Sequence, residues 1–195
     1  MKIDISFEPV RDAHVPLLAD IFNHYVEHSA AIFITKPISN DKMRAMLFFE
    51  DARYAAFAIF TDNALAGNEF TDNALAGNEF ANNALAGNEI TDKTLAGFVS
   101  IHGHNPRDAY RDTADITLYL APGYTGRGIG TRAVAFIEEY AKSRRFHALL
   151  AGISGVNIAS IRLFDKMGYI KVAHFKELGY KHGQFLDVLW YEKII

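Results

Sequence analysis

The residues from Leu118 to Thr131 constrain the fold more than any other stretch of this 195-residue chain. Apolar and polar side chains alternate up to Leu120, which predicts a strand with one buried face. Pro122 and Gly123 end that strand, and apolar residues at helical spacing begin a few positions later. Three glycines stand between the two segments: Gly126, Gly128 and Gly130. The stretch predicts a strand, a glycine-rich turn and the start of a helix, in that order.

This turn has the character of an anion site, because the first N–H groups of a helix have no partner within the helix. Its G-x-G-x-G spacing matches neither the dinucleotide fingerprint, which needs G-x-G-x-x-G, nor the P-loop, which needs Gly-Lys-Ser/Thr. On these residues alone, two interpretations remain open: a phosphate site, or a tight turn that binds nothing.

Composition excludes several classes of protein. The formal net charge is −3 and no basic stripe is visible, which argues against nucleic acid as a partner. The chain has no cysteine and therefore no disulfide, thiolate zinc site or cysteine nucleophile. Neither a signal peptide nor an apolar run of membrane-spanning length is visible. We expect one domain over residues 1–195, located in the cytoplasm and without a membrane partner.

The remaining patterns predict a mixed α/β sheet rather than repeated βαβ units. The expected order is strand, two helices, three strands, helix, strand, helix and two strands. We expect Asp12 and Ser39 to cap the first two helices at their N-termini. Asn157 is expected to begin the last helix and Gly168 to end it.

Residues 61–90 are three tandem ten-residue units: TDNALAGNEF, TDNALAGNEF and ANNALAGNEI. Without them the flanking segments form a simple hairpin, so the units are inserted at a hairpin tip, where added residues are well tolerated. A Leu, Phe or Ile recurs at every fifth position, which resembles the pentapeptide-repeat family. The alternatives are a stacked β-hairpin extension and a mobile loop. If β structure forms, its open edge invites pairing with a second chain.

Several polar residues are candidates for chemistry. Asp115, on the central strand beside the glycine turn, is either a general base or a solvated strand-end residue. His102 and His104 could ligate a metal, but no third ligand has suitable spacing, so we expect no metal. The histidines of the first helix are expected to be solvated positions rather than ligands: His14, His24 and His28. The apolar loop 30–37, which contains Phe33, either lines a pocket or simply packs.

Two motifs resemble those of the Gcn5-related N-acetyltransferase (GNAT) superfamily. Residues 125–130 match its Arg/Gln-x-x-Gly-x-Gly/Ala motif, with Thr125 at the first position. Residues 157–169 match its second motif, Asn-x-x-Ala-x-x-Leu-Tyr-x-Lys-x-Gly-Phe. Within the superfamily the chain resembles the phosphinothricin and methionine sulfone N-acetyltransferase branch, through VRDA at 10–13, YRDT at 110–113 and GQFLD at 183–187.

The resemblance implies a sheet that splays after the central strand, with acetyl-CoA as co-substrate in the gap. Backbone groups of the strand would pair with the pantetheine arm, amides of residues 126–131 would hold the pyrophosphate, and Asn157 would touch the cofactor. The implied cofactor-binding residues are Leu118, Tyr119, Leu120, Thr125, Gly126, Arg127, Gly128, Ile129, Gly130, Thr131 and Asn157.

The resemblance also implies the chemistry. Asp115 falls where the branch has a glutamate base, which would take a proton from the substrate ammonium so that the amine attacks the thioester. The substrate would be a small primary amine, such as phosphinothricin or methionine sulfone or sulfoximine, held by Tyr110, Arg111 and Phe33. A homodimer is expected on the same basis.

The chain departs from the branch at four positions: Thr125 stands where Arg or Gln is usual, Asp115 is one methylene shorter than the glutamate, and the other two are Phe164 and Asn105. Phe164 replaces a tyrosine that serves many relatives as an acid, and Asn105 replaces an arginine that serves the substrate carboxylate. The alternative function is therefore an acyl-CoA-binding or non-catalytic assembly module whose repeat drives self-association.

Overall fold

The computed structural model describes residues 4–62 and 93–195. Within these two ranges, seven strands and four α-helices follow one another in the predicted order, which confirms the mixed α/β expectation. The strands are β1 Ile5–Pro9, β2 Ala55–Thr61, β3 Thr94–Gly103, β4 Thr113–Leu120, β5 Ala148–Ser154, β6 Ile170–Lys181 and β7 Gln184–Ile194. The helices are α1 Val15–His28, α2 Asn40–Leu47, α5 Ile129–Ser143 and α6 Ile158–Lys166, with short 3-10 turns η1 Asp12–His14 and η2 Asp108–Tyr110. The predicted repeat at 61–90 lies almost entirely outside the described residues.

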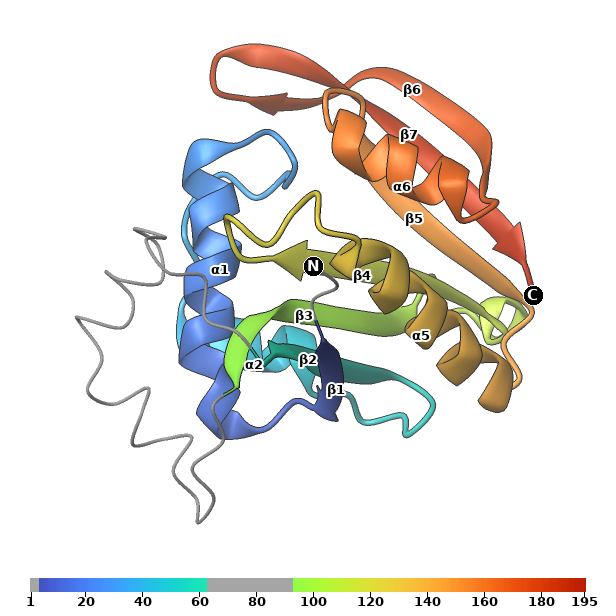
Figure 1. Cartoon of the computed structure of the whole chain (residues 1–195). Coiled ribbons are helices and arrows are strands. Elements are labelled where there is room, and N and C mark those ends of the chain that lie inside the picture. Colours follow the sequence, from blue (N-terminus) through green and yellow to red (C-terminus); the bar gives the residue numbers. More distant parts are fainter. Residues whose placement is uncertain (1–3, 63–92) are drawn as a thin grey trace.

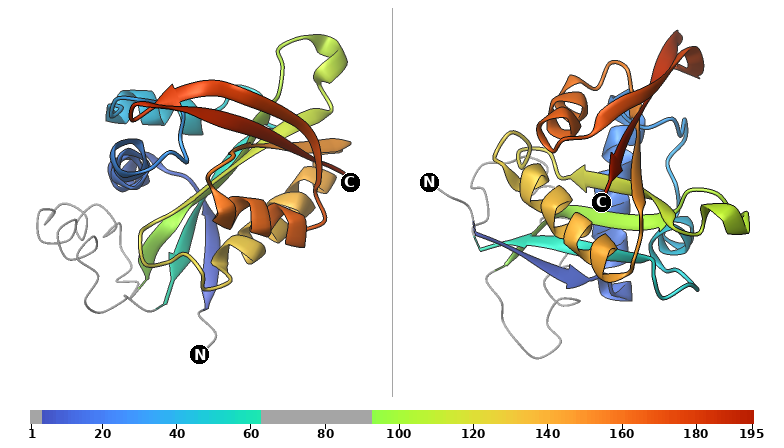
Figure 2. Two further views of the ribbon diagram at one scale, coloured as in Figure 1. Left: turned by 90° about the horizontal axis from the view of Figure 1, so that it is seen from above. Right: turned by 90° about the vertical axis from the view of Figure 1, so that its right-hand side faces the viewer.

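The strands form one sheet in the order β1-β2-β3-β4-β5-β7-β6, and β4–β5 is its parallel pair. Helices α1 and α2 cover one face of the sheet, and α5 and α6 cover the opposite face (Figures 1 and 2). Buried apolar side chains from both helical layers pack against the strands in one core, among them Leu18, Phe22, Phe98, Ile101, Ile129 and Ile137. No helix in the described part of the chain is long and apolar enough to cross a membrane.

The sheet divides in its centre, between β4 and β5. These strands pair over only three residues of β4, from Thr113 opposite Ala148 to Asp115 opposite Leu150. Beyond that point β4 continues to Leu120 and β5 to Ser154, and the two strands diverge (Figure 1). The divergence leaves backbone groups of both strands without a partner in the sheet, and such groups must bind something else.

Of the four expected helix ends, three are right and one is wrong. The Ser39 hydroxyl accepts from the Lys42 N–H at 3.2 Å, as a capping serine should. The last helix begins after Asn157 and ends before Gly168, as expected. Asp12 does not cap α1: it lies in η1 and pairs with the Arg44 side chain of α2 at 2.6 Å. Proline in the first turn of α1 lowers the need for a cap, because proline has no N–H to satisfy.

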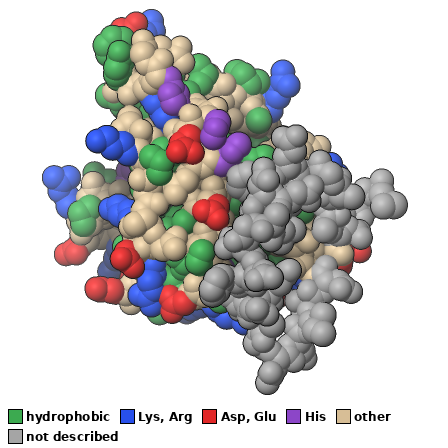
Figure 3. Space-filling model, turned by 90° about the vertical axis from the view of Figure 1, so that its left-hand side faces the viewer, with side chains coloured by type: hydrophobic (Ala, Val, Ile, Leu, Met, Phe, Trp, Pro, Cys, Tyr) green, Lys and Arg blue, Asp and Glu red, His purple; other side chains and the backbone are tan. Residues whose placement is uncertain are grey.

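The histidines of the first helical region also differ from one another. His14 is fully buried, against the expectation of a solvated position, and its ring lies edge-on to Phe60 at 5.5 Å. Its Nδ1 accepts from the Arg11 N–H at 3.2 Å, and burial lowers the pKa of the imidazole, which favours the neutral ring. His24 and His28 stack on each other at 4.7 Å on the α1 side of the molecule, where Figure 3 shows histidine side chains gathered.

Candidate active site

A pocket occupies the gap where β4 and β5 diverge. Four consecutive residues of β4, from Ile116 to Tyr119, form one wall, and residues 151–153 of β5 form the other. Helix α6 supplies a third wall and the loop after α1 reaches it through Ala31; the lining residues from the α6 region are Asn157, Ser160, Leu163 and Phe164. The pocket therefore begins at the residue that follows Asp115, the last β4 residue paired with β5.

The glycine turn lies between β4 and α5 and has the backbone geometry of a ligand loop. Gly126 and Gly128 have φ angles of +72° and +80°, in the left-handed region where other residues are strained. A Cβ built on either glycine would meet no atom of the described chain within 4 Å, so packing does not explain them. Gly128 is the N-cap of α5, which leaves the first N–H groups of that helix open to an anion.

Gly130 differs from the other two glycines, because its neighbours fill the space beside it. A Cβ there would lie 3.1 Å from a methyl of Leu163 on α6 and 3.6 Å from one of Leu118 on β4. This glycine lets α5 approach α6 and the open edge of β4. The three glycines thus combine two unlike functions: backbone conformation at two positions and close packing at the third.

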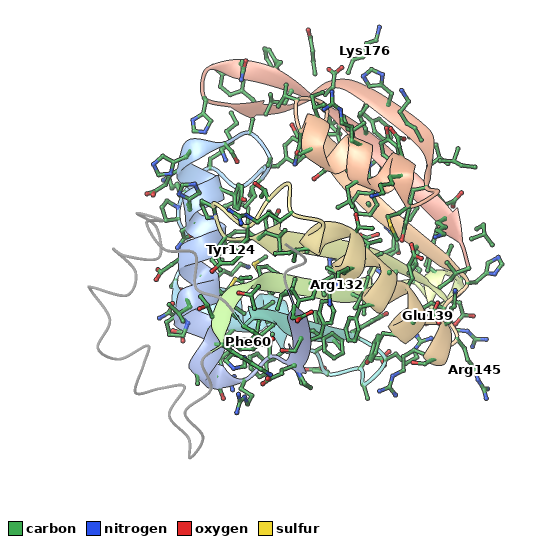
Figure 4. All side chains as sticks on the ribbon, viewed as in Figure 1. Phe60, Tyr124, Arg132, Glu139, Arg145 and Lys176 are labelled. Atoms are coloured by element: carbon green, nitrogen blue, oxygen red, sulfur yellow. The ribbon has the colours of Figure 1, made fainter. Side chains whose placement is uncertain are left out.

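Buried and bridging side chains hold the turn in place. Tyr124 is fully buried and turns inward from the loop (Figure 4), and its N–H donates to the Ala121 carbonyl at 3.0 Å. Arg127 is exposed, and its Nε donates to the Gly123 carbonyl across the turn at 2.7 Å. Ile129 is buried, Thr125 is exposed and Thr131 is half-buried. The part of this loop that a ligand can reach is therefore mostly backbone.

The predicted residues outside the turn contribute unequally to the pocket. Leu118 and Tyr119 line it, although the Tyr119 ring packs on Phe22 of α1 at 5.2 Å. The Leu120 carbonyl already accepts from the Tyr25 hydroxyl at 2.7 Å, so Leu120 is less available than predicted. Asn157 lines the pocket and also caps α6, because its Oδ1 accepts from the Ser160 N–H at 3.1 Å.

This arrangement fits an acyl-CoA molecule. Such a molecule has an amide-containing extended arm followed by a pyrophosphate. The unpaired edge of β4 offers backbone groups for the amides, and the N-terminus of α5 offers free N–H groups for the phosphates. The fit rests on these backbone groups, since the reachable loop presents few side chains.

Asp115 lies on the opposite face of β4 from Leu118, because successive strand residues alternate. Its Oδ1 lies 2.8 Å from Nδ1 of His104, which extends from the end of β3. Burial raises the pKa of the Asp115 carboxyl above its ordinary value, while the hydrogen bond and charge of His104 oppose that rise. The His104 ring is edge-on to Trp190 of β7 at 5.4 Å and lies 6.2 Å from the Tyr110 ring.

The two histidines at the end of β3 have separate partners. His102 approaches the Thr117 hydroxyl through Nε2 at 3.2 Å, whereas His104 binds Asp115. Within residues 4–62 and 93–195, no group of three or more His, Cys, Asp or Glu side chains has the arrangement of a metal site.

The three predicted substrate residues are not brought together. Tyr110 lies beside His104 and therefore near Asp115. The Arg111 side chain is exposed and pairs with Asp112 at 3.5 Å. Phe33 packs against β6 instead, where a Cβ on Gly179 would come within 2.8 Å of its ring. The structure thus groups Tyr110 with Asp115 and gives no contact between that group and Arg111 or Phe33.

Sequence reasoning missed two residues of this group, His104 as a partner of Asp115 and Trp190. The signal for His104 was available in part, since His102 and Asp115 are cross-strand neighbours once the β3–β4 register is known. Trp190 is 75 residues downstream of Asp115 in the printed sequence, and only the β5–β7 pairing places it opposite Gly152. That glycine leaves room for the indole, whose nearest atoms would be 3.4 Å from a Cβ there.

Comparison with known proteins agrees with this geometry. Residues 40–169 match the family model described as acetyltransferase (GNAT) family. A phosphinothricin N-acetyltransferase from Streptomyces coelicolor is 27% identical over 192 residues, covering 97% of this chain and 96% of that relative. An L-methionine sulfoximine/L-methionine sulfone acetyltransferase from Salmonella typhimurium is 27% identical over 88% of this chain and 83% of its own length.

A solved structure has the same fold. It is a GNAT superfamily phosphinothricin acetyltransferase from Sinorhizobium meliloti in complex with AcCoA. It superposes with a TM-score of 0.77 at 18% identity, covering 100% of this chain and 89% of the other. With the family model spanning more than half of the sequence, the protein belongs to the acetyltransferase (GNAT) family.

Proposed function

We propose that this acetyltransferase moves the acetyl group of acetyl-CoA to the primary amine of a small amino-acid-like molecule, with Asp115 as the basic group of the site. One observation carries the proposal: the pocket opens directly after Asp115, with the glycine turn on one face of β4 and the carboxylate on the other. The two substrates can therefore enter from opposite faces and meet at the gap.

The chemistry requires a neutral amine. An ammonium ion has no lone pair, so a base must remove one proton before the nitrogen attacks the thioester carbon. The new C–N bond forms as the C–S bond breaks, and the sulfur leaves with the electron pair. We assign a backbone N–H near Leu118, in the part of β4 that does not pair with β5, to stabilise the developing oxyanion. After the attack the nitrogen carries one proton more than the amide product and releases it to water. Phe164 lines the pocket and has no acidic proton, so the leaving sulfur takes its proton from water in this proposal.

The substrate class follows from the relatives, whose names specify phosphinothricin and methionine sulfoximine or sulfone. These compounds carry an amine next to a carboxylate, which calls for a cation near the amine site. We assign that role to Arg111 or Arg107, on the loop before β4, because Asn105 cannot supply a charge. Tyr110 and Phe33 would provide the apolar surface for the rest of the substrate.

The first experiment is calorimetric titration with acetyl-CoA, followed by assays with L-methionine sulfone and phosphinothricin as acceptors. Coenzyme A release can be followed with a thiol-reactive dye, because the chain has no cysteine to react in the background. Micromolar binding and amine-dependent thiol release are the expected results. No binding at millimolar acetyl-CoA would overturn the proposal, and binding without release would favour the non-catalytic alternative.

We also propose a cytoplasmic homodimer. Strand β6 is the edge of the sheet and carries exposed apolar side chains, including Ile170, Leu178 and Tyr180 with 72%, 63% and 61% of their surface accessible. Such an edge favours association with another chain. Sedimentation at several protein concentrations tests this, and a monomer at all of them would exclude it.

A further inference from the structure

Among the residues that the structure describes, His104 is hydrogen-bonded to Asp115, and the proposed chemistry has not used it. The side chains of His104 and Asp115 retain only 27% and 18% of their accessible surface, and Asp115 directly precedes Ile116, the first pocket-lining residue of β4. Trp190 on one side and Tyr110 on the other limit how the imidazole can turn. The hydrogen bond to Asp115 and the two ring contacts fix the position of the His104 ring, so we ask what this ring does in the reaction.

The hydrogen bond determines which ring nitrogen is available. An ionised carboxylate can only accept hydrogen bonds, so Nδ1 of His104 must be the donor to Oδ1 of Asp115. In the neutral ring the other nitrogen, Nε2, then carries a lone pair and no hydrogen. Nε2 makes no hydrogen bond to any described residue, so it is available to accept a proton.

We propose that Nε2 of His104, held in place by Asp115, is the atom that receives the proton of the substrate ammonium. The N–H bond of the ammonium breaks, its electron pair stays on the amine nitrogen, and the pair becomes an imidazolium beside a carboxylate. This inference rests on the proposed function and deepens it, because the proton moves to the ring rather than remaining on Asp115.

Acid–base strength favours the ring over the carboxylate. An unperturbed aspartate has a pKa of about 3.9 and an unperturbed histidine one of about 6.5, and a general base works best near the ambient pH. Aspartate is also one methylene shorter than glutamate, so it reaches less far from β4, and one of its oxygens is already engaged by His104. The carboxylate then serves to orient the ring and to stabilise its positive form.

The other ionisable groups facing the pair are few. His102 lies on the same face of β3 and Tyr110 comes from η2, while Trp190 of β7 adds an uncharged wall. His102 lies on β3, two residues before His104, and is bonded to Thr117, so it is a matched control of the same residue type.

The kinetic test uses L-methionine sulfone as acceptor and compares His104→Asn with His102→Asn. Asparagine can keep the donor to Asp115 but has no basic nitrogen. We expect His104→Asn to lower kcat by about 100-fold with little change in KM, whereas His102→Asn stays within about threefold of wild type. Added imidazole should partly restore His104→Ala and leave His102→Ala unchanged. A His104→Asn enzyme within about fivefold of wild type would overturn the assignment.

A second measurement needs no acceptor and separates this inference from the proposed function. The tautomer of the neutral His104 ring, followed by ¹⁵N NMR, should be mainly Nδ1–H in the wild type and should lose that preference in Asp115→Ala, because Nδ1–H loses its acceptor. The tautomer of His102 should change much less. An unchanged His104 tautomer overturns the pair even if the wild-type enzyme is active. If the wild type releases no coenzyme A but the His104 tautomer changes, the proposed function fails and the hydrogen-bonded pair stands.

Discussion

The two faces of the divided sheet form the candidate site from different chemical groups. On the α5 side the candidate site is backbone: two glycines with positive φ, a helix N-terminus and an unpaired strand edge. On the α1 side it is made of side chains, Asp115, His104, Tyr110 and Trp190, which come from four separate segments. A backbone site suits a cofactor shared by many enzymes, whereas a side-chain site suits a substrate that differs between them.

The largest effect that this comparison predicts is in Asp115→Asn, which should lower turnover strongly and leave acetyl-CoA affinity nearly unchanged. The substitution keeps the shape of the side chain and removes the charge that holds His104. We expect kcat to fall by about 10²- to 10⁴-fold, because the proton-accepting pair loses the carboxylate that orients the His104 ring and stabilises its positive form. Affinity for acetyl-CoA, measured by calorimetry, should stay within about twofold, since a backbone site on the other face is unchanged. Turnover within a few-fold of wild type would remove Asp115 from the chemistry.

Gly128→Val, in contrast to Asp115→Asn, should lower the affinity for acetyl-CoA. The new side chain would occupy the open space at the N-terminus of α5, where the phosphates are expected. We expect calorimetry to show a dissociation constant raised at least tenfold, about 1.4 kcal/mol.

Gly168→Val is the matched control for this change. Gly168 has the same φ of +80° and the same open surroundings, but it ends α6 and lies outside the turn. Both variants should lose about 1–2 kcal/mol of stability from backbone strain, so a difference in binding reports the site itself. Equal weakening of acetyl-CoA binding in both would show that the glycine turn is a structural element only.

The same contrast explains what the sequence alone could predict. The order of elements, the glycine turn and the Asn157 cap depend on local chemistry, so short-range patterns were sufficient to find them. The Asp115–His104 contact depends on the β3–β4 register, and Trp190 on the β5–β7 pairing, which no local pattern specifies. Asp12 was assigned to a cap by the same local reasoning, but a tertiary partner, Arg44, holds it instead.

A smaller effect is expected from Arg127→Ala on the backbone side. This side chain is exposed and braces the turn through the Gly123 carbonyl, while the proposed phosphate ligands are amide groups. We expect the acetyl-CoA dissociation constant to rise by about two- to fivefold, consistent with the loss of one hydrogen bond at an exposed site. A rise above about 50-fold, which is more than 2 kcal/mol, would mean that the side chain itself binds the cofactor, and the contrast between the two faces would be weaker than proposed.

The smallest effect on catalysis should come from deleting residues 61–90. Three whole units are removed, so Thr91 and Asp92 take the sequence positions of Thr61 and Asp62. Thr61 pairs with Thr94 across the β2–β3 hairpin, so the shortened chain needs only a two-residue turn, a common hairpin connection. His102 follows Thr94 by eight positions along β3. The deletion is therefore about 26 Å of strand away from the substrate side.

We therefore expect kcat and acetyl-CoA affinity of the deletion variant to stay within about twofold of wild type. Its free energy of unfolding should be no lower, because a shorter loop costs less entropy to close. Sedimentation then decides what the repeat does: a smaller oligomer with intact turnover makes it an assembly element, and an unchanged oligomer makes it passive. A tenfold loss of turnover in a folded variant would mean that the repeat affects catalysis. The two faces of the sheet would then not be sufficient to explain activity.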